Sequence, residues 1–243
     1  MNNFEILDPK RHQSLRIITE RGADFGDDVM YAMAYPFEFR LLQSEYPLLF
    51  RKNADNGSFY SVCLFGFEPN ENLFITKNSW IATTIPNAIS REPFLIADRR
   101  KPGSDQLENL VVSVNIDHPR AQFADGERVF DEQGLPTDFL ESAIEHLQKM
   151  HSGHLQNQAF CELLKTLNLF TAVTIEVPLS KPITLDGFYT IDEAQLATLS
   201  GEQLASLHTA GWLESIYMLM ASMNQISSLV QKKTKIESSV EDQ

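Results

Sequence analysis

The chain has 243 residues, of which 43% are hydrophobic, so it can bury a sizeable core. Its net charge of -13 argues against nonspecific binding of nucleic acid and of anionic membranes, because both depend on an excess of Lys and Arg. No segment approaches the roughly 20 apolar residues of a membrane span. The amino terminus also lacks a secretory signal pattern, so we expect a cytoplasmic protein without a membrane span.

Residues 55–130 have the pattern of a β-rich region. Two apolar runs, 59–67 and 73–76, flank the turn sequence EPNEN and predict a hairpin. A second antiparallel pair is predicted from residues 93–98 and 109–117, which a loop with Pro102 and Gly103 separates. Cys63 and Cys161 are far apart in sequence and lack metal-like partners, so we expect two reduced, buried thiols.

After Pro136 the hydrophobic period changes from two to 3.6. A helix is predicted to begin at Asp138, which can cap it with Glu141, and to end near Ser152 and Gly153. A second helix carries Phe160 to Leu167. The alternation over 173–179, followed by a turn and the segment 183–191, then predicts another hairpin.

The end of the chain is predicted to be helical. Asp192 with Gln195, and Ser200 with Gln203, match capping boxes, and Gly211 separates two helices. The last helix carries an apolar stripe from Trp212 to Val230, which can pack on the core or on another chain.

These patterns together predict an α+β fold, with an antiparallel β-rich first half packed against a helical second half. We expect one domain over residues 1–230, β-rich over 1–130 and mainly helical over 131–230. Residues 231–243 have little apolar content and are predicted to form a flexible tail.

The common motifs for nucleotides, dinucleotides, esterases and zinc proteases are missing. His146, His151 and His154 cluster as metal ligands can, but a helix end suits histidines without any metal. Asp117 and His118 form only part of an iron triad, because no third ligand can be assigned. We therefore predict no catalytic residue, no metal site and no cofactor, and the sequence favours a protein that is not an enzyme.

Aromatic residues supply the candidates for a binding surface. Tyr46, Trp80 and Phe94 could line a groove, with Arg91 as a bidentate partner for a carboxylate. The alternative is that these aromatics belong to the core and that Arg91 is a structural anchor. Trp212 and Met223 on the last helix could contact a partner or form a homo-oligomer, since thioethers suit adaptable surfaces.

Several segments together carry a family resemblance over nearly the whole chain. They are SEYPLLF (44–50), LFGFEPNENLFI (64–75), Trp80, residues 86–94 continuing through REPFLIA (91–97), GLPTDFLESAIEHL, LDGFYTIDEAQLATL and LHTAGWLESIYMLMASMNQISSL. In order and spacing they resemble the SapC-like family. The chain departs from that pattern at Asn78, where a glycine is expected, and at Glu92, where an aromatic residue is common.

The resemblance implies a setting rather than a mechanism. Genes of this family stand beside those of outer-membrane nutrient receptors, tryptophan-halogenase-like proteins and cupin-like proteins, which implies a shared uptake or modification pathway. We therefore hypothesise a non-enzymatic accessory or regulatory protein that binds a peptide or protein partner. One alternative is an enzyme of unrecognised type acting on a peptide or amino-acid-derived substrate, and a weaker one is a surface-layer or export component.

Overall fold

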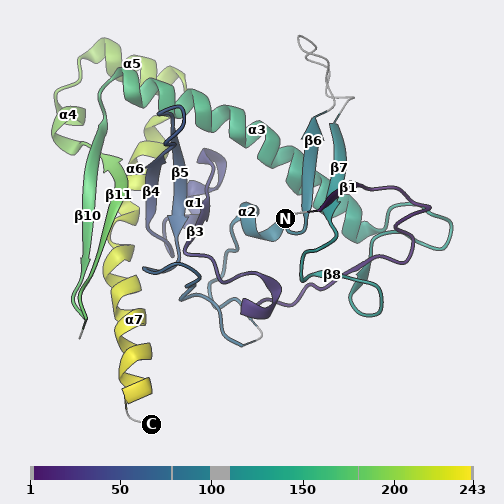
Figure 1. Ribbon diagram of the computed structural model, residues 1–243. Helices are drawn as coiled ribbons and strands as arrows, with labels where there is room; N and C mark the ends of the chain where they lie inside the picture. The colour runs from purple at the N-terminus through teal and green to yellow at the C-terminus, as the bar shows by residue number, and fades with distance from the viewer. Residues whose placement is uncertain (1–2, 78, 99–109, 180, 242–243) are drawn as a thin grey trace. The chain divides into compact units, whose positions relative to one another are not determined.

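The computed structural model describes residues 3–77, 79–98, 110–179 and 181–241. The chain divides into two compact units (Figure 1). Unit 1 comprises residues 1–28, 75–81 and 87–152, and unit 2 comprises residues 29–74, 82–86 and 153–243. Antiparallel sheets and helices confirm the α+β class. That residues 1–230 form a single domain stays a prediction.

Unit 1 contains two small antiparallel sheets. The first has the order β1 (Phe4–Ile6), β7 (Leu110–Asn115), β6 (Phe94–Asp98), and the second has the order β8 (Ala121–Gln122), β2 (Arg16–Ile17), β9 (Glu127–Arg128). A short 3-10 helix, η1 (Ala23–Phe25), the helix α2 (Asn87–Ser90) and the first part of α3 (Asp138–Thr166) complete it. Its core contains Leu15, Ile17, Phe94, Val114, Val129, Phe130, Leu140 and Leu147.

Unit 2 is built on a five-stranded antiparallel sheet. Its order is β10 (Phe170–Val177), β11 (Ile183–Ile191), β4 (Leu48–Lys52), β5 (Phe59–Leu64), β3 (Tyr31–Met33). The helical elements are η2 (Pro36–Glu38), α1 (Phe39–Leu42), the second part of α3, α4 (Glu193–Ala197), α5 (Gly201–Thr209), α6 (Leu213–Ser222) and α7 (Gln225–Glu241). Phe160 of α3 packs against Phe39, Phe50 and Trp212.

Two of the three predicted strand pairs are confirmed. β6 pairs with β7, and β10 pairs with β11, both antiparallel. The hairpin of 59–67 with 73–76 is wrong, because β5 pairs with β4 and β3 instead. Side chains hold residues 67–74 in a tight loop, since Glu71 Oε2 accepts a bond from the Phe67 N–H at 2.7 Å and Asn72 Oδ1 accepts one from the Phe74 N–H at 2.9 Å.

The first predicted helix, from Asp138 to near Gly153, forms part of the long helix α3 and differs from its prediction at both ends. Helix α3 runs without a break from Asp138 to Thr166, and Thr137 rather than Asp138 caps it, with Oγ1 3.4 Å from the Leu140 N–H. Gly153 therefore lies inside a helix. A Cβ at this position would lie 3.0 Å from Phe37 Cδ1 and 3.1 Å from Tyr35 Cγ, so the glycine serves close packing and not helix termination.

The predicted capping residues near the carboxyl end are confirmed. Asp192 accepts a bond from the Gln195 N–H, and Ser200 with Gln203 forms a complete capping box. Gly211 separates α5 from α6 with φ of 78°, in the left-handed region that favours glycine.

The last predicted helix needs two corrections. It is interrupted at Met223 and Asn224, which separate α6 from α7. The predicted flexible tail is instead helical to Glu241. Lys233 stabilises this extension, because its ammonium lies 2.5 Å from both Glu68 Oε2 and Glu71 Oε1. Burial lowers the pKa of Lys233, but the bonds to both carboxylates raise it more, so the charged form is favoured.

The predicted buried thiols are confirmed, since Cys63 and Cys161 are both free and buried. Burial raises the pKa of Cys161 to about 12 and that of Cys63 well above its ordinary value. Within the described ranges, no helix has both the length and the apolar character needed to cross a bilayer.

Candidate functional site

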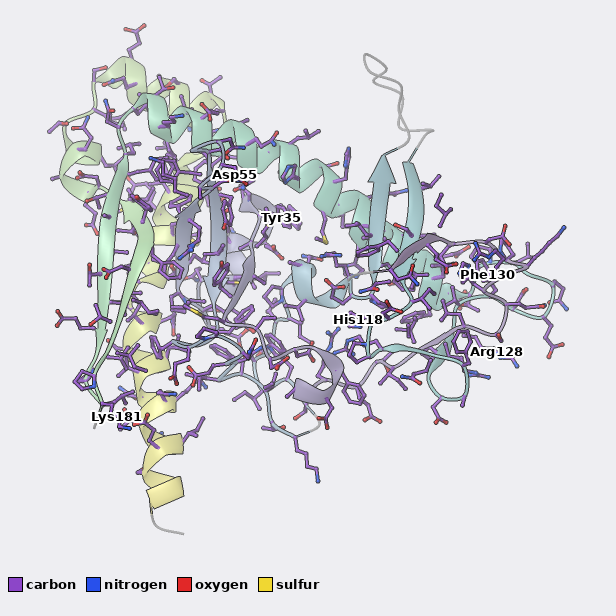
Figure 2. All side chains as sticks on the ribbon, in the orientation of Figure 1. Tyr35, Asp55, His118, Arg128, Phe130 and Lys181 are labelled. Atoms are coloured by element: carbon purple, nitrogen blue, oxygen red, sulfur yellow. The ribbon has the colours of Figure 1, made fainter. Side chains whose placement is uncertain are left out.

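A cleft of about 800 Å³ lies in unit 2 where the sheet ends at β3. Residues from β3, from β5, from the β4–β5 turn and from the second part of α3 line it. They are Tyr31, Met33, Asn53, Asn56, Ser58, Phe59, Tyr60, His154, Asn157, Gln158 and Glu162. Figure 2 labels Asp55 in that turn and Tyr35 just after β3. The volume of the cleft falls within the roughly 300–1,000 Å³ typical of ligand pockets.

The backbone of β3 has one open edge. In the pair with β5, Ala34 N donates to Ser61 O and Phe65 N donates to Met30 O, so the bonded positions of this segment are 30, 32 and 34. The N–H and C=O groups of Tyr31 and Met33 therefore point away from β5. No described residue bonds to them, so they can pair with an added strand.

The α3 side of the cleft is anchored by a buried polar contact. Asn157 is 1% exposed, and its Oδ1 lies 2.6 Å from Ser61 Oγ on β5. One turn away, His154 bonds Gln158 at 3.1 Å. The contact of Asn157 with Ser61 fixes the helix against the strand, since a buried amide must keep its partner.

On the other face of the sheet, Tyr31 and Tyr60 lie beside Arg51. The Arg51 guanidinium stacks over the Tyr31 ring at 5.4 Å and over Phe188 at 4.8 Å. Burial, and then the neighbouring Tyr31, raise the pKa of Tyr60, so its hydroxyl stays protonated at neutral pH. The cleft thus offers neutral hydroxyl and amide groups between aromatic rings.

Unit 1 holds a separate cluster of buried charges. Arg120 and Asp27 are 1% and 2% exposed, and Arg120 Nη2 lies 2.7 Å from Asp27 Oδ2. Arg120 also donates to the carbonyls of Ile18 and Glu20. Asp27 accepts a further bond from the Gly22 N–H at 2.8 Å. The cluster ties residues 18–27 to residue 120, which is a structural role.

Glu92 and His118 lie next to this cluster, with Glu92 Oε2 3.8 Å from His118 Nε2 (Figure 2 labels His118). Burial raises the pKa of Glu92, although Arg91 and Arg120 lower it in part. Burial and the charge of Arg120 lower the pKa of His118 below its ordinary value of 6.5. His118 Nδ1 accepts a hydrogen bond from the backbone N–H of Arg120 at 3.2 Å, and only the neutral ring has a nitrogen that can accept it.

This environment predicts an acid-sensitive contribution to stability. Below pH 6.5 His118 binds a proton more readily in the unfolded chain than in the folded protein. The free energy of unfolding therefore falls as the pH falls towards the folded pKa. Between pH 7.5 and 5.5, the free energy of unfolding of the wild type should fall relative to that of His118→Gln, by at most about 1.4 kcal/mol per pH unit. Urea titrations at both pH values measure it. Parallel pH dependence in the two proteins would contradict the neutral burial of His118.

Three of the predicted binding residues belong to unit 2. Tyr46 is fully buried, packs on Phe65 and Phe74, and donates its hydroxyl proton to Thr84 O at 2.6 Å. This placement favours the packing interpretation of Tyr46. Trp212 is half-buried against Phe160 and lines a smaller cleft of about 270 Å³, and Met223 is half-buried at the end of α6. Partner binding through Trp212 and Met223 stays a prediction.

The other three lie in unit 1. Phe94 is 1% exposed in the core. Arg91 pairs with Glu92 at 2.9 Å and donates to Phe94 O at 2.8 Å, as a structural anchor does. Trp80 is buried and forms an isolated β-bridge with Ile75. Asn78 lies outside the described residues. A binding role for Trp80 and Arg91 stays a prediction.

The residues that line the cleft were missed in the sequence. The signal that could have found them is the strict alternation of Tyr31, Met33 and Tyr35 with Ala32 and Ala34, which is typical of a strand. The histidines considered as metal ligands are spread along α3, and His146 bonds Asn87 at 2.9 Å. Over the described ranges, no three His, Cys, Asp or Glu residues are placed to hold a metal ion.

Comparison with known proteins gives one match. The model of a family described as SapC matches residues 7–229. Neither the curated proteins nor the solved structures provide a match to the chain.

Proposed function

The chain belongs to the SapC family, and from this premise we propose that it is a non-enzymatic accessory or regulatory protein that binds an extended peptide segment of a partner. The segment adds to the unit 2 sheet as a sixth strand along β3. The open backbone of Tyr31 and Met33 within an aromatic cleft carries this proposal.

Strand addition uses what this edge provides. The backbone groups of Tyr31 and Met33 supply affinity that does not depend on sequence, and side-chain pockets supply specificity. Phe59 and Tyr60 offer ring surfaces on opposite faces of β5, because successive side chains alternate along a strand. Met33 adds a flexible thioether that adapts to different side chains.

The lining favours binding over catalysis. His154 is the histidine among the described residues of the lining. It bonds the side-chain amide of Gln158, and no hydroxyl or thiol of the described lining bonds to His154. A nucleophile with an adjacent base is the arrangement that acyl transfer requires. The pathway implied by the family resemblance suggests the partner, a halogenase-like protein, a cupin-like protein or a receptor, and we place the encounter in the cytoplasm.

A proline substitution tests the proposal at one atom. Met33→Pro removes the N–H that points away from β5, so the pairing of β3 with β5 is kept, whereas Met33→Leu keeps both the N–H and an apolar side chain. Peptides selected from a random displayed library against the wild type are titrated by fluorescence anisotropy. We expect Met33→Pro to lose about tenfold or more in affinity and Met33→Leu to bind nearly as the wild type does.

Hydrogen exchange gives an independent readout. Bound peptide should protect the amides of Tyr31 and Met33, which have no partner among the described residues in the free protein. If the library yields no binder, or if Met33→Pro binds the selected peptides as tightly as the wild type, strand addition at β3 is wrong.

A further inference from the structure

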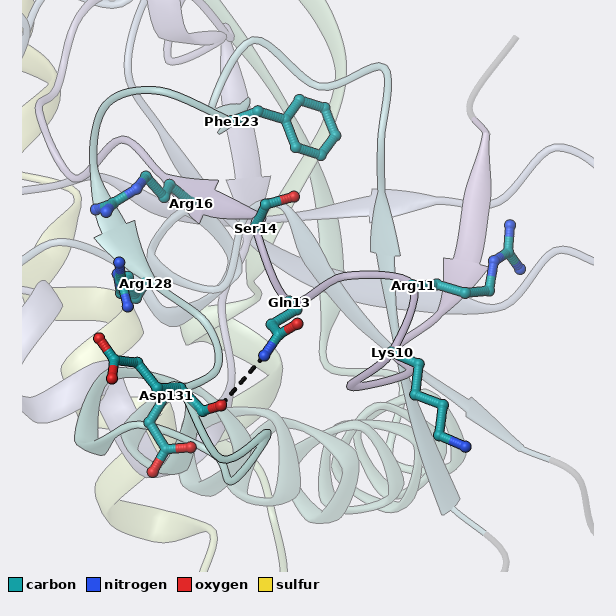
Figure 3. Close-up of a pocket in the computed structure, with 9 residues that line it drawn as sticks. Lys10, Arg11, Gln13, Ser14, Arg16, Phe123, Arg128 and Asp131 are labelled. Carbon is teal, nitrogen blue, oxygen red and sulfur yellow. Dashed lines mark hydrogen bonds between the residues drawn. The ribbon is translucent and has the colours of Figure 1, made fainter.

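A second surface, in unit 1, concentrates positive charge on a chain whose net charge is -13. A groove of about 500 Å³ is lined by Lys10, Arg11, Gln13, Ser14, Arg16, Phe123, Arg128, Asp131 and Glu132. Figure 3 shows Arg16 and Arg128 next to each other, with Phe123 above them and Lys10 and Arg11 across the groove. We call this surface the arginine groove.

Two like charges face each other in this groove. Arg16 on β2 is directly opposite Arg128 on β9 in the antiparallel register. Opposite residues in such a pair have Cβ atoms about 4.5–5.5 Å apart, and like charges there are destabilising. Neither guanidinium has a carboxylate within 4.0 Å among the described residues, although acidic residues outnumber basic ones by 33 to 20.

Of the two acidic residues in the lining, Asp131 is engaged by its own loop through one oxygen. Its Oδ1 accepts bonds from the N–H groups of Gln133 and Leu135 at 2.9 and 2.8 Å. Within the part of the chain that the structure describes, the Arg16 guanidinium makes one hydrogen bond, to the carbonyl of Gly126 at 2.8 Å. Most donors of the two guanidinium groups thus have no acceptor among the described residues and can bind an external one.

The backbone around the pair is held in place. Gly126 has φ of 105°, and a Cβ there would lie 2.5 Å from Ile17 O, so the β8–β9 turn is closely packed on β2. This turn carries Phe123, whose side chain is 60% exposed. The groove therefore combines two cations on a closely packed backbone with an apolar ring beside them.

We propose that the arginine groove binds an acidic peptide segment, whose oxyanions pair with Arg16 and Arg128 and whose adjacent apolar side chain packs on Phe123. Arginine forks match carboxylate and phosphate oxygens in a bidentate way. Asp131 and Glu132 at the rim, with the overall charge of -13, disfavour a continuous polyanion such as nucleic acid. This surface is independent of the β3 cleft and does not rest on the proposed function.

The test uses the full chain and three labelled probes. They are a peptide that alternates glutamate with phenylalanine, the same peptide with phosphoserine in place of glutamate, and a single-stranded oligonucleotide. Each is titrated by fluorescence anisotropy at low salt against the wild type, Arg16→Gln, Arg128→Gln and the double variant. Lys181→Gln is the matched control, because it removes one exposed positive charge from the β10–β11 turn (Figure 2).

We expect the double variant to lose about tenfold or more in peptide affinity, and Lys181→Gln to lose little. The two peptides distinguish carboxylate from phosphate as the preferred oxyanion. Equal losses in the double variant and in Lys181→Gln, or tighter binding of the oligonucleotide than of either peptide, would overturn the proposal. The same titrations in a Met33→Pro background remove any pairing of the peptides with β3, so the losses caused by Arg16→Gln and Arg128→Gln there belong to the arginine groove.

Stability gives a second readout. If Arg16 and Arg128 are kept for an external anion, relief of their repulsion in Arg128→Gln should keep or raise the melting temperature while binding falls. A clear decrease in melting temperature would show that the pair is structural, and the assignment of a ligand would then be wrong.

Discussion

Arg120→Met is expected to lower the free energy of unfolding of unit 1 by about 3–5 kcal/mol. The substitution removes the Arg120 guanidinium 2.7 Å from the Asp27 carboxylate, which is 2% exposed, and leaves the longer pair with Arg21 at 3.4 Å. It also removes the donors to the carbonyls of Ile18 and Glu20. Removing the nearer partner of a buried charge costs more than the net value of the pair itself, so the loss should be large.

The two tryptophans allow each unit to be observed separately, because Trp80 belongs to unit 1 and Trp212 to unit 2. Urea titrations in a Trp212→Phe background therefore report unit 1. Arg11→Gln is the matched control, since it breaks an exposed ion pair with Glu5 and should cost about 0–1 kcal/mol. Arg120→Met combined with Asp27→Asn should recover part of the loss, because the buried side chain at position 27 is then neutral. A cost for Arg120→Met as small as that of Arg11→Gln would show that the buried Asp27 carboxylate does not depend on Arg120.

Gly153→Ala should destabilise unit 2 by about 1–3 kcal/mol, against the usual direction of a Gly→Ala change in a helix. The added methyl group would lie 3.0 Å from Phe37 Cδ1 and 3.1 Å from Tyr35 Cγ, and these two rings are stacked on each other. The Tyr35 ring is buried, so it can move only by disturbing its neighbours.

A second glycine provides the control. Gly201 begins α5, and a Cβ there would meet nothing within 4 Å, so Gly201→Ala should stabilise unit 2 by about 0.4–1 kcal/mol. Fluorescence of Trp212 in a Trp80→Phe background measures the stability of both variants, since Trp212 packs on Phe160 of α3, the helix that carries Gly153. Stabilisation by both substitutions would mean that Phe37 and Tyr35 move aside without lowering the free energy of unfolding of unit 2.

Gly153 also shows why the sequence predicted the wrong end for a helix. Glycine is a common helix terminator, and a single sequence does not reveal a ring that packs on the glycine from η2. The same limit applies to the loop after β5, where apolar residues 73–76 have strand character but side chains of Glu71 and Asn72 hold the backbone in a turn.

Local signals were sufficient for several features that depend on neighbours in the chain. The capping residues Asp192 and Ser200, the β6–β7 and β10–β11 pairs, and the buried thiols were all confirmed. Each of these depends on alternation, on a turn, or on a side chain that bonds a few residues away. The α+β class follows from the same patterns.

The candidate sites depended on contacts between distant residues. Strand order alone places β3 at the edge of its sheet and leaves the backbone of Tyr31 and Met33 open, and register alone sets Arg16 opposite Arg128. The aromatics chosen from the sequence, Tyr46 and Phe94, are instead buried in the cores of their units. The sequence by itself determined the periodicity, the caps and the family of this protein, because these are local or cumulative properties of the chain. Only the tertiary structure decided which backbone edge stays open and which charges lack an opposite charge among the described residues, because that depends on pairing between distant strands, 112 positions apart for Arg16 and Arg128.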